Sequence, residues 1–244
     1  IKIKYLNKIK YNFDYGELKE LYIKSKNKTR LPVIFELDKD FLTLIGLWLG
    51  DGSYDNYNKN RVIFSDNEVE AVQLYRRVAK KLNLGISQMT DDWSWSLNSA
   101  ILYKFMKYVL KLYGEAKDKK IPEFIFNLSN EQLKNVISRY FSADGTVKDY
   151  EVGSASQSND LIYGMQTLLL RYGIISRASR HAREDGCKEL IISSHENINL
   201  FKQIKFIPER KNNKLLKIRN IVPNHTVSDI IPINPNWIDE VKEF

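Results

Sequence analysis

The sequence predicts an α+β fold in which one structural unit is used twice, and three observations lead to this prediction. An apolar run that ends in Asp-Gly occurs at residues 41–52 (FLTLIGLWLGDG) and again at 136–145 (VISRYFSADG). The same coarse order of polar hairpin, amphipathic helix, two short strands and closing helix follows each run. Each copy also ends in Lys-x-x-Pro, at residues 119–122 and 205–208. We therefore expect two αββαββα units.

The elements of the first copy follow from spacing. After the apolar helix, alternation predicts a strand at 61–64, and apolar residues near helical spacing predict a helix at 67–82 that Gly85 ends. Two strands at 86–89 and 93–97 and a helix at 100–112 complete the unit.

The second copy repeats the order. Here we expect a hairpin at 146–156, a helix at 160–172 stopped by Gly173, strands at 174–181 and 188–193, and a helix at 196–204. The predicted domains are a basic N-terminal arm (1–40), the first unit (41–122), the second unit (123–210) and a C-terminal tail (211–244).

Composition narrows the class of protein. The chain has 244 residues, 43% of them hydrophobic, which is enough for a packed core, and no apolar run approaches the roughly 20 residues that cross a bilayer. Its one cysteine, Cys187, excludes an internal disulfide framework and a cysteine-based zinc cluster. We expect an intracellular protein, cytoplasmic or organellar, with no membrane partner.

Positive charge is concentrated at the two flanks of the chain. Residues 1–30 carry nine Lys/Arg against three Asp/Glu, and residues 202–219 carry seven against one. Each flank is thus +6 within a total of +8, which leaves the body at about −4. Basic flanks on an acidic body favour contact with a polyanion such as nucleic acid, and a solvated surface is the equally weighted alternative.

The repeated Asp-Gly pairs indicate a metal site. Gly46 and Gly50 lie on one face of the first apolar helix and would let the second helix approach closely, so Asp51 and Asp144 would project together. Two adjacent carboxylates repel unless a cation neutralises them or one stays protonated, and oxygen donors favour Mg²⁺ over zinc. A single Asp-Gly after a helix is usually a turn, and we interpret Asp185-Gly186 in that way.

The repeated segments resemble the paired motifs of the LAGLIDADG homing endonucleases in their single-chain form. Residues 44–52 (LIGLWLGDG) match at the leucines, the first glycine and Asp-Gly, whereas residues 137–145 match mainly at Ala-Asp-Gly. The Lys-x-x-Pro segments resemble the lysine elements of the intein-associated branch. The resemblance covers about residues 41–210.

This resemblance implies site-specific cleavage of both strands of a long DNA target. Asp51 and Asp144 would be metal ligands, with the backbone carbonyls of Gly50 and Ala143. Lys119 and Lys205 would act as the active-site lysines. It further implies two or three Mg²⁺ ions, for which Mn²⁺ would substitute. The fold would be pseudo-symmetric, with two four-stranded antiparallel sheets forming a saddle on the DNA, in a monomer with no obligate protein partner.

The chain departs from the family pattern at two places. Arg139 stands where the family usually has a close-packing glycine, so we expect a looser or asymmetric helix contact on that side. Asp66 and Gln157 stand where some members have a lysine after the first hairpin.

Polar and aromatic side chains of the hairpins are the expected DNA contacts. They are Tyr54, Asn56, Tyr57, Asn58, Lys59 and Arg61 in the first copy, and Lys148, Arg177, Arg180, His181, Arg183 and Lys188 in the second. A non-cleaving DNA-binding regulator or an RNA-splicing maturase on the same scaffold is the alternative function.

Overall fold

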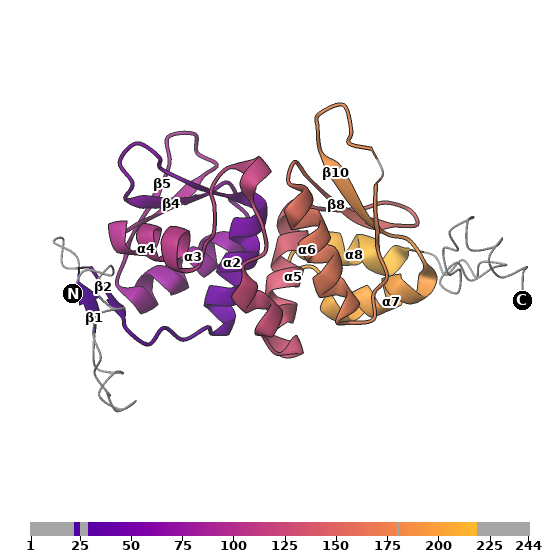
Figure 1. Cartoon of the computed structure of the whole chain (residues 1–244), viewed down its shortest axis with the longest axis horizontal. Coiled ribbons are helices and arrows are strands. Elements are labelled where there is room, and N and C mark those ends of the chain that lie inside the picture. The colour runs from indigo at the N-terminus through magenta and orange to yellow at the C-terminus, as the bar shows by residue number, and fades with distance from the viewer. Residues whose placement is uncertain (1–21, 25–28, 180, 219–244) are drawn as a thin grey trace, which may run out of the picture.

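The protein consists of two units side by side, with a pair of helices between them (Figure 1). The structure, a computed structural model, describes residues 22–24, 29–179 and 181–218. Most of the predicted N-terminal arm, the tail beyond residue 218 and Arg180 lie outside the described residues. No helix in the described part of the chain is long and apolar enough to span a membrane.

The first unit has the predicted order of elements. They are α2 (Lys39–Asp51), β3 (Gly52–Tyr54), β4 (Arg61–Phe64), α3 (Val69–Leu82), β5 (Gly85–Gln88), β6 (Trp95–Asn98) and α4 (Ala100–Lys104). A π-helical turn, Phe105–Val109, continues α4, and two 3₁₀ turns, Ala116–Asp118 and Glu123–Asn127, lead to the second unit.

The second unit repeats this order. Its elements are α5 (Asn130–Asp144), β7 (Gly145–Val147), β8 (Val152–Ser156), α6 (Asn159–Leu170), β9 (Arg177–Ala178), β10 (Lys188–Ile192) and α7 (His195–Ile204). A further helix, α8 (Glu209–Lys217), follows α7 and was not expected from the sequence. The αββαββα prediction is confirmed for both units.

Each unit contains a four-stranded antiparallel sheet. The strand orders are β3-β4-β6-β5 and β7-β8-β10-β9, so the two sheets have the same topology. A separate two-stranded sheet pairs β1 (Tyr22–Lys24) with β2 (Arg30–Pro32) at the outer end of the first unit (Figure 1).

Strand pairing fixes which side chains share a face of each sheet. Paired residues point to the same side, and successive residues alternate. In the first sheet Tyr54, Val62 and Leu97 form one buried row against the helices. The opposite, open face carries Ser53, Ile63 and Ser96 in one row and Arg61 with Asn98 in the next. In Figure 1 both sheets lie along the upper side of the molecule and the helices lie below.

Local signals explain where the two central helices begin. Asp38 is the N-cap of α2 and its side chain accepts a hydrogen bond from the Phe41 N–H at 2.8 Å. Ser129 and Gln132 form a capping box at the start of α5. The middle of α2 is buried on all sides, since the helix lies between its own sheet and α5.

Several boundaries differ from the sequence prediction. The helix expected at 100–112 is α-helical only to Lys104, and the strand expected at 174–181 contracts to Arg177–Ala178. The helix α3 ends at Asn83, which adopts the left-handed conformation with φ of 51°, so Gly85 begins a strand instead of ending the helix.

Candidate functional site

The two central helices cross where α2 carries glycine. A methyl group on Gly46 would lie 2.3 Å from the Val136 carbonyl oxygen, so the backbones meet directly there. A methyl group on Gly50 would lie 2.7 Å from Ala143 Cβ and 3.4 Å from Asp144 Oδ2. This close approach brings the carboxyl ends of α2 and α5 together.

Asp51 and Asp144 are the last residues of these two helices, and both are partly buried. Burial, together with the negative charges of Asp144 and Asp66, raises the pKa of the Asp51 carboxyl to about 7. Burial also raises the pKa of Asp144, while Lys119 and Lys211 oppose that shift. The two carboxylates are therefore close together and partly desolvated. Keeping both of them ionised without a neutralising cation costs free energy.

Lys119 lies at the end of α2. The side chain is only 6% exposed, and its Nζ donates hydrogen bonds to the carbonyl oxygens of Gly50 at 2.5 Å and Trp48 at 3.1 Å. Burial lowers the pKa of Lys119 to about 8, although the Asp144 and Asp51 carboxylates counteract this. The ammonium thus satisfies helix-end carbonyls and places a positive charge beside the carboxylate pair.

The corresponding lysine at the end of α5 is Lys211, on α8. Its Nζ donates to the carbonyl oxygens of Ser142 at 2.5 Å, Gly145 at 2.8 Å and Ala143 at 3.3 Å. Burial lowers its pKa, as it does for Lys119.

Lys205, which the Lys-x-x-Pro repeat selected, makes no described hydrogen bond to these carbonyls. Its side chain is exposed, and its backbone carbonyl accepts the Ser138 hydroxyl at 2.8 Å. Lys211 was not among the residues expected from the repeat. The available signal was Pro208 followed by a charged run with helical spacing, which predicts another helix that could return a lysine to the site.

Arg139 makes the two sides of the helix pair unequal. Its side chain is 1% exposed and its Nη2 pairs with Oδ2 of Asp66, between β4 and α3 of the first unit. We expected the contact between α2 and α5 to be looser or asymmetric at Arg139. It is asymmetric but tight, because the α5 backbone packs directly on Gly46 while the Arg139 guanidinium extends to Asp66.

The donor set at the helix ends fits a hard divalent cation. It offers two carboxylates and the carbonyls of Gly50 and Ala143, all oxygen. Across residues 22–24, 29–179 and 181–218, no group of three or more His, Cys, Asp or Glu side chains gathers as a metal cluster. An ion held here would therefore depend on the Asp51–Asp144 pair, on the carbonyls and on oxygens from water or a phosphate.

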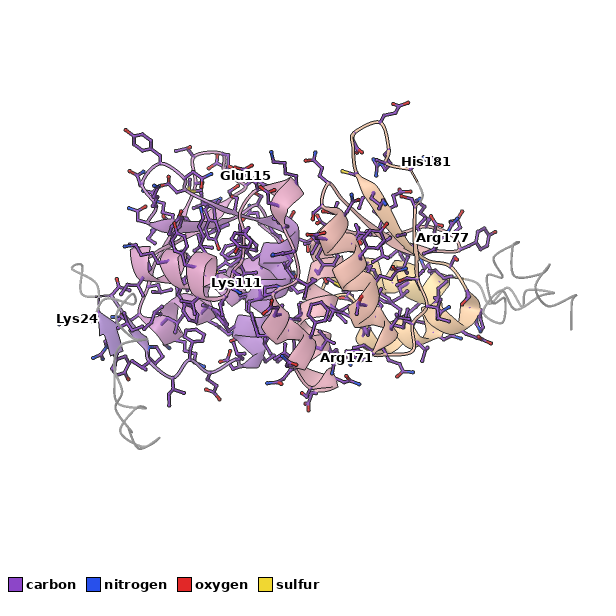
Figure 2. The ribbon with its side chains drawn as sticks, viewed as in Figure 1. Lys24, Lys111, Glu115, Arg171, Arg177 and His181 are labelled. Atoms are coloured by element: carbon purple, nitrogen blue, oxygen red, sulfur yellow. The ribbon has the colours of Figure 1, made fainter. Side chains whose placement is uncertain are left out.

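Of the expected DNA contacts, Arg61 and Arg177 lie on the open faces of the sheets. Arg61 pairs with Asn98, and Arg177 with Ile191, on the side away from the helices. Figure 2 shows Arg177 and His181 on the second unit, far from the central helix pair. Tyr57 is 93% exposed in the β3–β4 loop, together with Asn56, Asn58 and Lys59. Lys148 and Arg183 are exposed but form ion pairs with Glu151 and with Asp185 and Glu189.

Two of the expected contacts are placed differently. Tyr54 is a core residue, 6% exposed, whose hydroxyl donates to the Leu112 carbonyl at 2.8 Å, so it is not a surface contact. Lys188 alternates in phase with buried Leu190 and therefore points to the helix side of the sheet, where its Nζ donates to the Tyr163 hydroxyl at 2.9 Å. Arg180 lies outside the described residues.

Residues 131–205 match the LAGLIDADG-like domain family. Two curated proteins of Methanocaldococcus jannaschii are similar to most of the chain. Glutamine--fructose-6-phosphate aminotransferase (isomerizing) is 27% identical over 219 residues, which cover 84% of this chain and 19% of that protein. DNA-directed RNA polymerase subunit Rpo1C is 27% identical over 224 residues, which cover 89% and 25%. The chain thus spans a quarter or less of the length of these relatives.

Solved structures share the fold. The structure of I-DmoI in complex with DNA and Mn gives a TM-score of 0.54 at 17% identity, covering 69% of this chain and 97% of that one. The homing endonuclease I-WcaI bound to its DNA recognition sequence gives 0.53 at 17% identity, covering 75% and 88%. Full-length DUF199/WhiA from Thermatoga maritima gives 0.51 at 12% identity, covering 86% and 67%.

Proposed function

We propose that this chain, which contains a LAGLIDADG-like domain and has the LAGLIDADG fold, is a divalent-metal-dependent endonuclease that cuts both strands of a long double-stranded DNA target. The observation that carries the proposal is the pair Asp51 and Asp144 at the adjoining ends of α2 and α5, each helix end with its own buried or half-buried lysine. A protein that only binds DNA has no need to desolvate two carboxylates side by side.

Each residue of the site has a separate role in this proposal. Asp51 and Asp144 would hold the cation, which when bound stabilises negative charge on the phosphate under attack. Lys119 and Lys211 keep the helix-end carbonyls in place and supply positive charge where the phosphate would enter. Mg²⁺ is the ion we expect, with Mn²⁺ able to replace it.

The open faces of the sheets would receive the duplex. They carry Arg61 in the first unit and Arg177 in the second, and both lie on the surface that the helices leave uncovered. Arginine at such positions reaches phosphates or guanine edges in the major groove. The I-DmoI and I-WcaI structures, which share the fold, are of proteins bound to DNA.

The similar proteins support a second part of the proposal, that this segment is a module carried inside unrelated hosts. An aminotransferase and an RNA polymerase subunit have no named activity in common. Yet each contains a stretch similar to this chain, which makes up 19% of the aminotransferase and 25% of the polymerase subunit. The similarity to this chain is then a property of the matching stretch and not of the activity of either protein. This favours the intein-associated form of the family.

Selection from a random library tests the function without knowledge of the target. The protein is incubated with randomised duplexes and Mg²⁺, and the cut ends are sequenced. We expect one enriched site with cuts on both strands. Asp51→Asn and Asp144→Asn should each abolish double-strand cutting while DNA binding survives, because the amide keeps the shape of the carboxylate and removes its charge.

Asp185→Asn is the matched control. It makes the same substitution in an Asp-Gly pair that lies in an exposed turn, where the Asp185 side chain accepts the Cys187 N–H. We expect it to cut like the wild type. Equal cutting by Asp51→Asn, Asp144→Asn and Asp185→Asn, or the absence of an enriched site, would refute the proposed nuclease function.

Binding without cleavage is the second candidate function. It is favoured by one observation: the carbonyls of Gly50 and Ala143, which would help hold the ion, already accept hydrogen bonds from Lys119 and Lys211. Enrichment of a bound sequence without cut ends in the same library would support it.

A further inference from the structure

Among the ion pairs of the described residues, only one has both side chains buried. It joins the two units and lies beside the Asp51–Asp144 pair. Arg139 of α5 and Asp66 of the first unit are 1% and 9% exposed at their side chains. The other described ion pairs leave at least one partner well exposed. Burying a guanidinium and a carboxylate is costly, so the pair calls for a role beyond ordinary packing.

The pair is linked to Asp51 through the backbone. The Ser65 N–H donates to the Asp51 carbonyl at 3.0 Å, and Ser65 directly precedes Asp66. The Asp66 carboxylate uses one oxygen for Arg139 and the other for the Glu68 N–H, at 2.8 Å. Arg139 therefore fixes the short segment that holds the end of α2.

Among the described residues of the second unit, no ion pair corresponds to this one. Gly46 occupies the position in α2 that Arg139 occupies in α5, and it has no side chain to extend. Ser158, at the junction between β8 and α6, instead donates its hydroxyl to the Lys119 carbonyl. The support of Asp51 thus includes a buried ion pair, whereas the support of Asp144 does not.

From this asymmetry we infer that Arg139 and Asp66 form a positioning pair for Asp51 alone, so that cleavage of one DNA strand depends on the pair and cleavage of the other does not. The inference rests on the proposed nuclease function. Because both side chains are buried, we assign neither of them a contact with the reacting phosphate. Arg139 acts through Asp66 and the Ser65–Asp51 hydrogen bond, and a displacement of a carboxylate by even about 1 Å can cost on the order of 100-fold in rate.

The test uses the double variant Asp66→Asn with Arg139→Met, which removes both charges together. Either single variant would leave one buried charge without a partner and could unfold the protein. Nicking of each strand is followed on a target duplex labelled differently at its two ends. We expect one strand to be cut at least about tenfold more slowly relative to the other, with the second strand near the wild-type rate.

Arg210→Met is the matched control. Arg210 also reaches from the second unit to the same junction, but its side chain is 67% exposed and its ion pair, at 2.5 Å, is with Glu68 instead of Asp66. We expect this variant to cut both strands as the wild type does. A strand bias equal to that of the double variant would overturn the assignment to Arg139 and Asp66.

Calorimetric titration with Ca²⁺ adds a readout that does not depend on cutting. The double variant should weaken the binding event that Asp51→Asn removes. A uniform slowing of both strands, or unchanged strand rates with unchanged Ca²⁺ binding, would overturn the inference while leaving the nuclease intact. A wild-type protein that neither cuts DNA nor binds Ca²⁺ would refute the proposed function and this inference together.

Discussion

The Asp144 carboxylate packs against the bare backbone of Gly50, so that a methyl group on Gly50 would lie 3.4 Å from Asp144 Oδ2. The acidic residue of one helix thus lies at van der Waals distance from the point where a side chain on the other helix would begin, and Ala143 Cβ, at 2.7 Å, lies closer still. This close approach brings Asp144 beside the last turn of α2, which Asp51 ends. It also makes the glycines of α2 part of the site without any chemistry of their own.

Replacing these glycines should therefore cost stability in a fixed order. Gly46→Ala would place a methyl group 2.3 Å from a backbone oxygen that cannot move aside, so we expect a loss of about 3 kcal/mol or more in the free energy of unfolding. Gly50→Ala meets Ala143 Cβ at 2.7 Å, and we expect about 1–2 kcal/mol. Urea unfolding measures both.

Gly85→Ala is the control for this series. Gly85 lies at the exposed start of β5, where a methyl group would make an ordinary contact of 3.4 Å with Asn98 Cβ. We expect a change within about 0.5 kcal/mol. If Gly46→Ala were equally neutral, the direct backbone contact between α2 and α5 would be wrong.

The raised pKa of Asp51 predicts how stability varies with pH. Between about pH 4 and 7 the folded protein keeps a proton on Asp51 that the unfolded chain has released, so the free energy of unfolding should fall as pH rises through this range. Asp51→Asn removes this term. At pH 8, without divalent metal, the variant should be more stable than the wild type by up to about 4 kcal/mol.

Thermal unfolding at several pH values, with and without Mg²⁺, measures this effect. Added Mg²⁺ should stabilise the wild type at pH 8 and stabilise Asp51→Asn less, since a ligand that binds only the folded state raises its stability and the variant loses one of its ligands. A variant less stable than the wild type at pH 8 would show that Asp51 is not held at a cost.

Sequence reasoning found the parts of the site that are local in the chain. Asp51 and Asp144 each end an apolar run, so their position at a helix end follows from spacing within about ten residues. The alternation of side chains along β10 could also have placed Lys188. Leu190 and Ile192 are apolar and point to the core, and every second residue of a strand points to the same side, so residue 188 does too.

Contacts between distant segments could not be predicted in this way. Lys211 reaches carbonyls 66 to 69 residues earlier in the chain, and this depends on where α8 packs. Tyr54 belongs to a strand of three residues, which is too short for alternation to show its buried side. The Arg139–Asp66 pair spans 73 residues and two units, and it depends on how α5 packs against the segment between β4 and α3.

Lysine substitutions distinguish the two lysine assignments of the second unit. Lys211→Met should slow cutting on the order of 10²- to 10³-fold, the usual cost of losing one transition-state stabilising group, because its ammonium lies at the end of α5. Lys205→Met should have little effect, since that side chain is exposed and the described hydrogen bonds to the carbonyls at the end of α5 come from Lys211. Single-turnover cleavage measures both. A strong loss in Lys205→Met with an active Lys211→Met would restore the assignment based on Lys-x-x-Pro.

The orientation of the arginines on the sheets predicts the salt dependence of DNA binding. If about ten phosphates are neutralised, the logarithm of the binding constant should fall with the logarithm of salt concentration at a slope near −9. Arg61→Ala and Arg177→Ala remove cations from the open faces, so each should weaken binding and reduce the slope by about one.

Lys188→Ala provides the comparison, because this lysine points to the helix side and donates to Tyr163. We expect its slope to match that of the wild type in fluorescence anisotropy titrations across a range of salt concentrations. If Lys188→Ala lowered the slope and the two arginine variants did not, the DNA would have to lie on the helix side of the sheets.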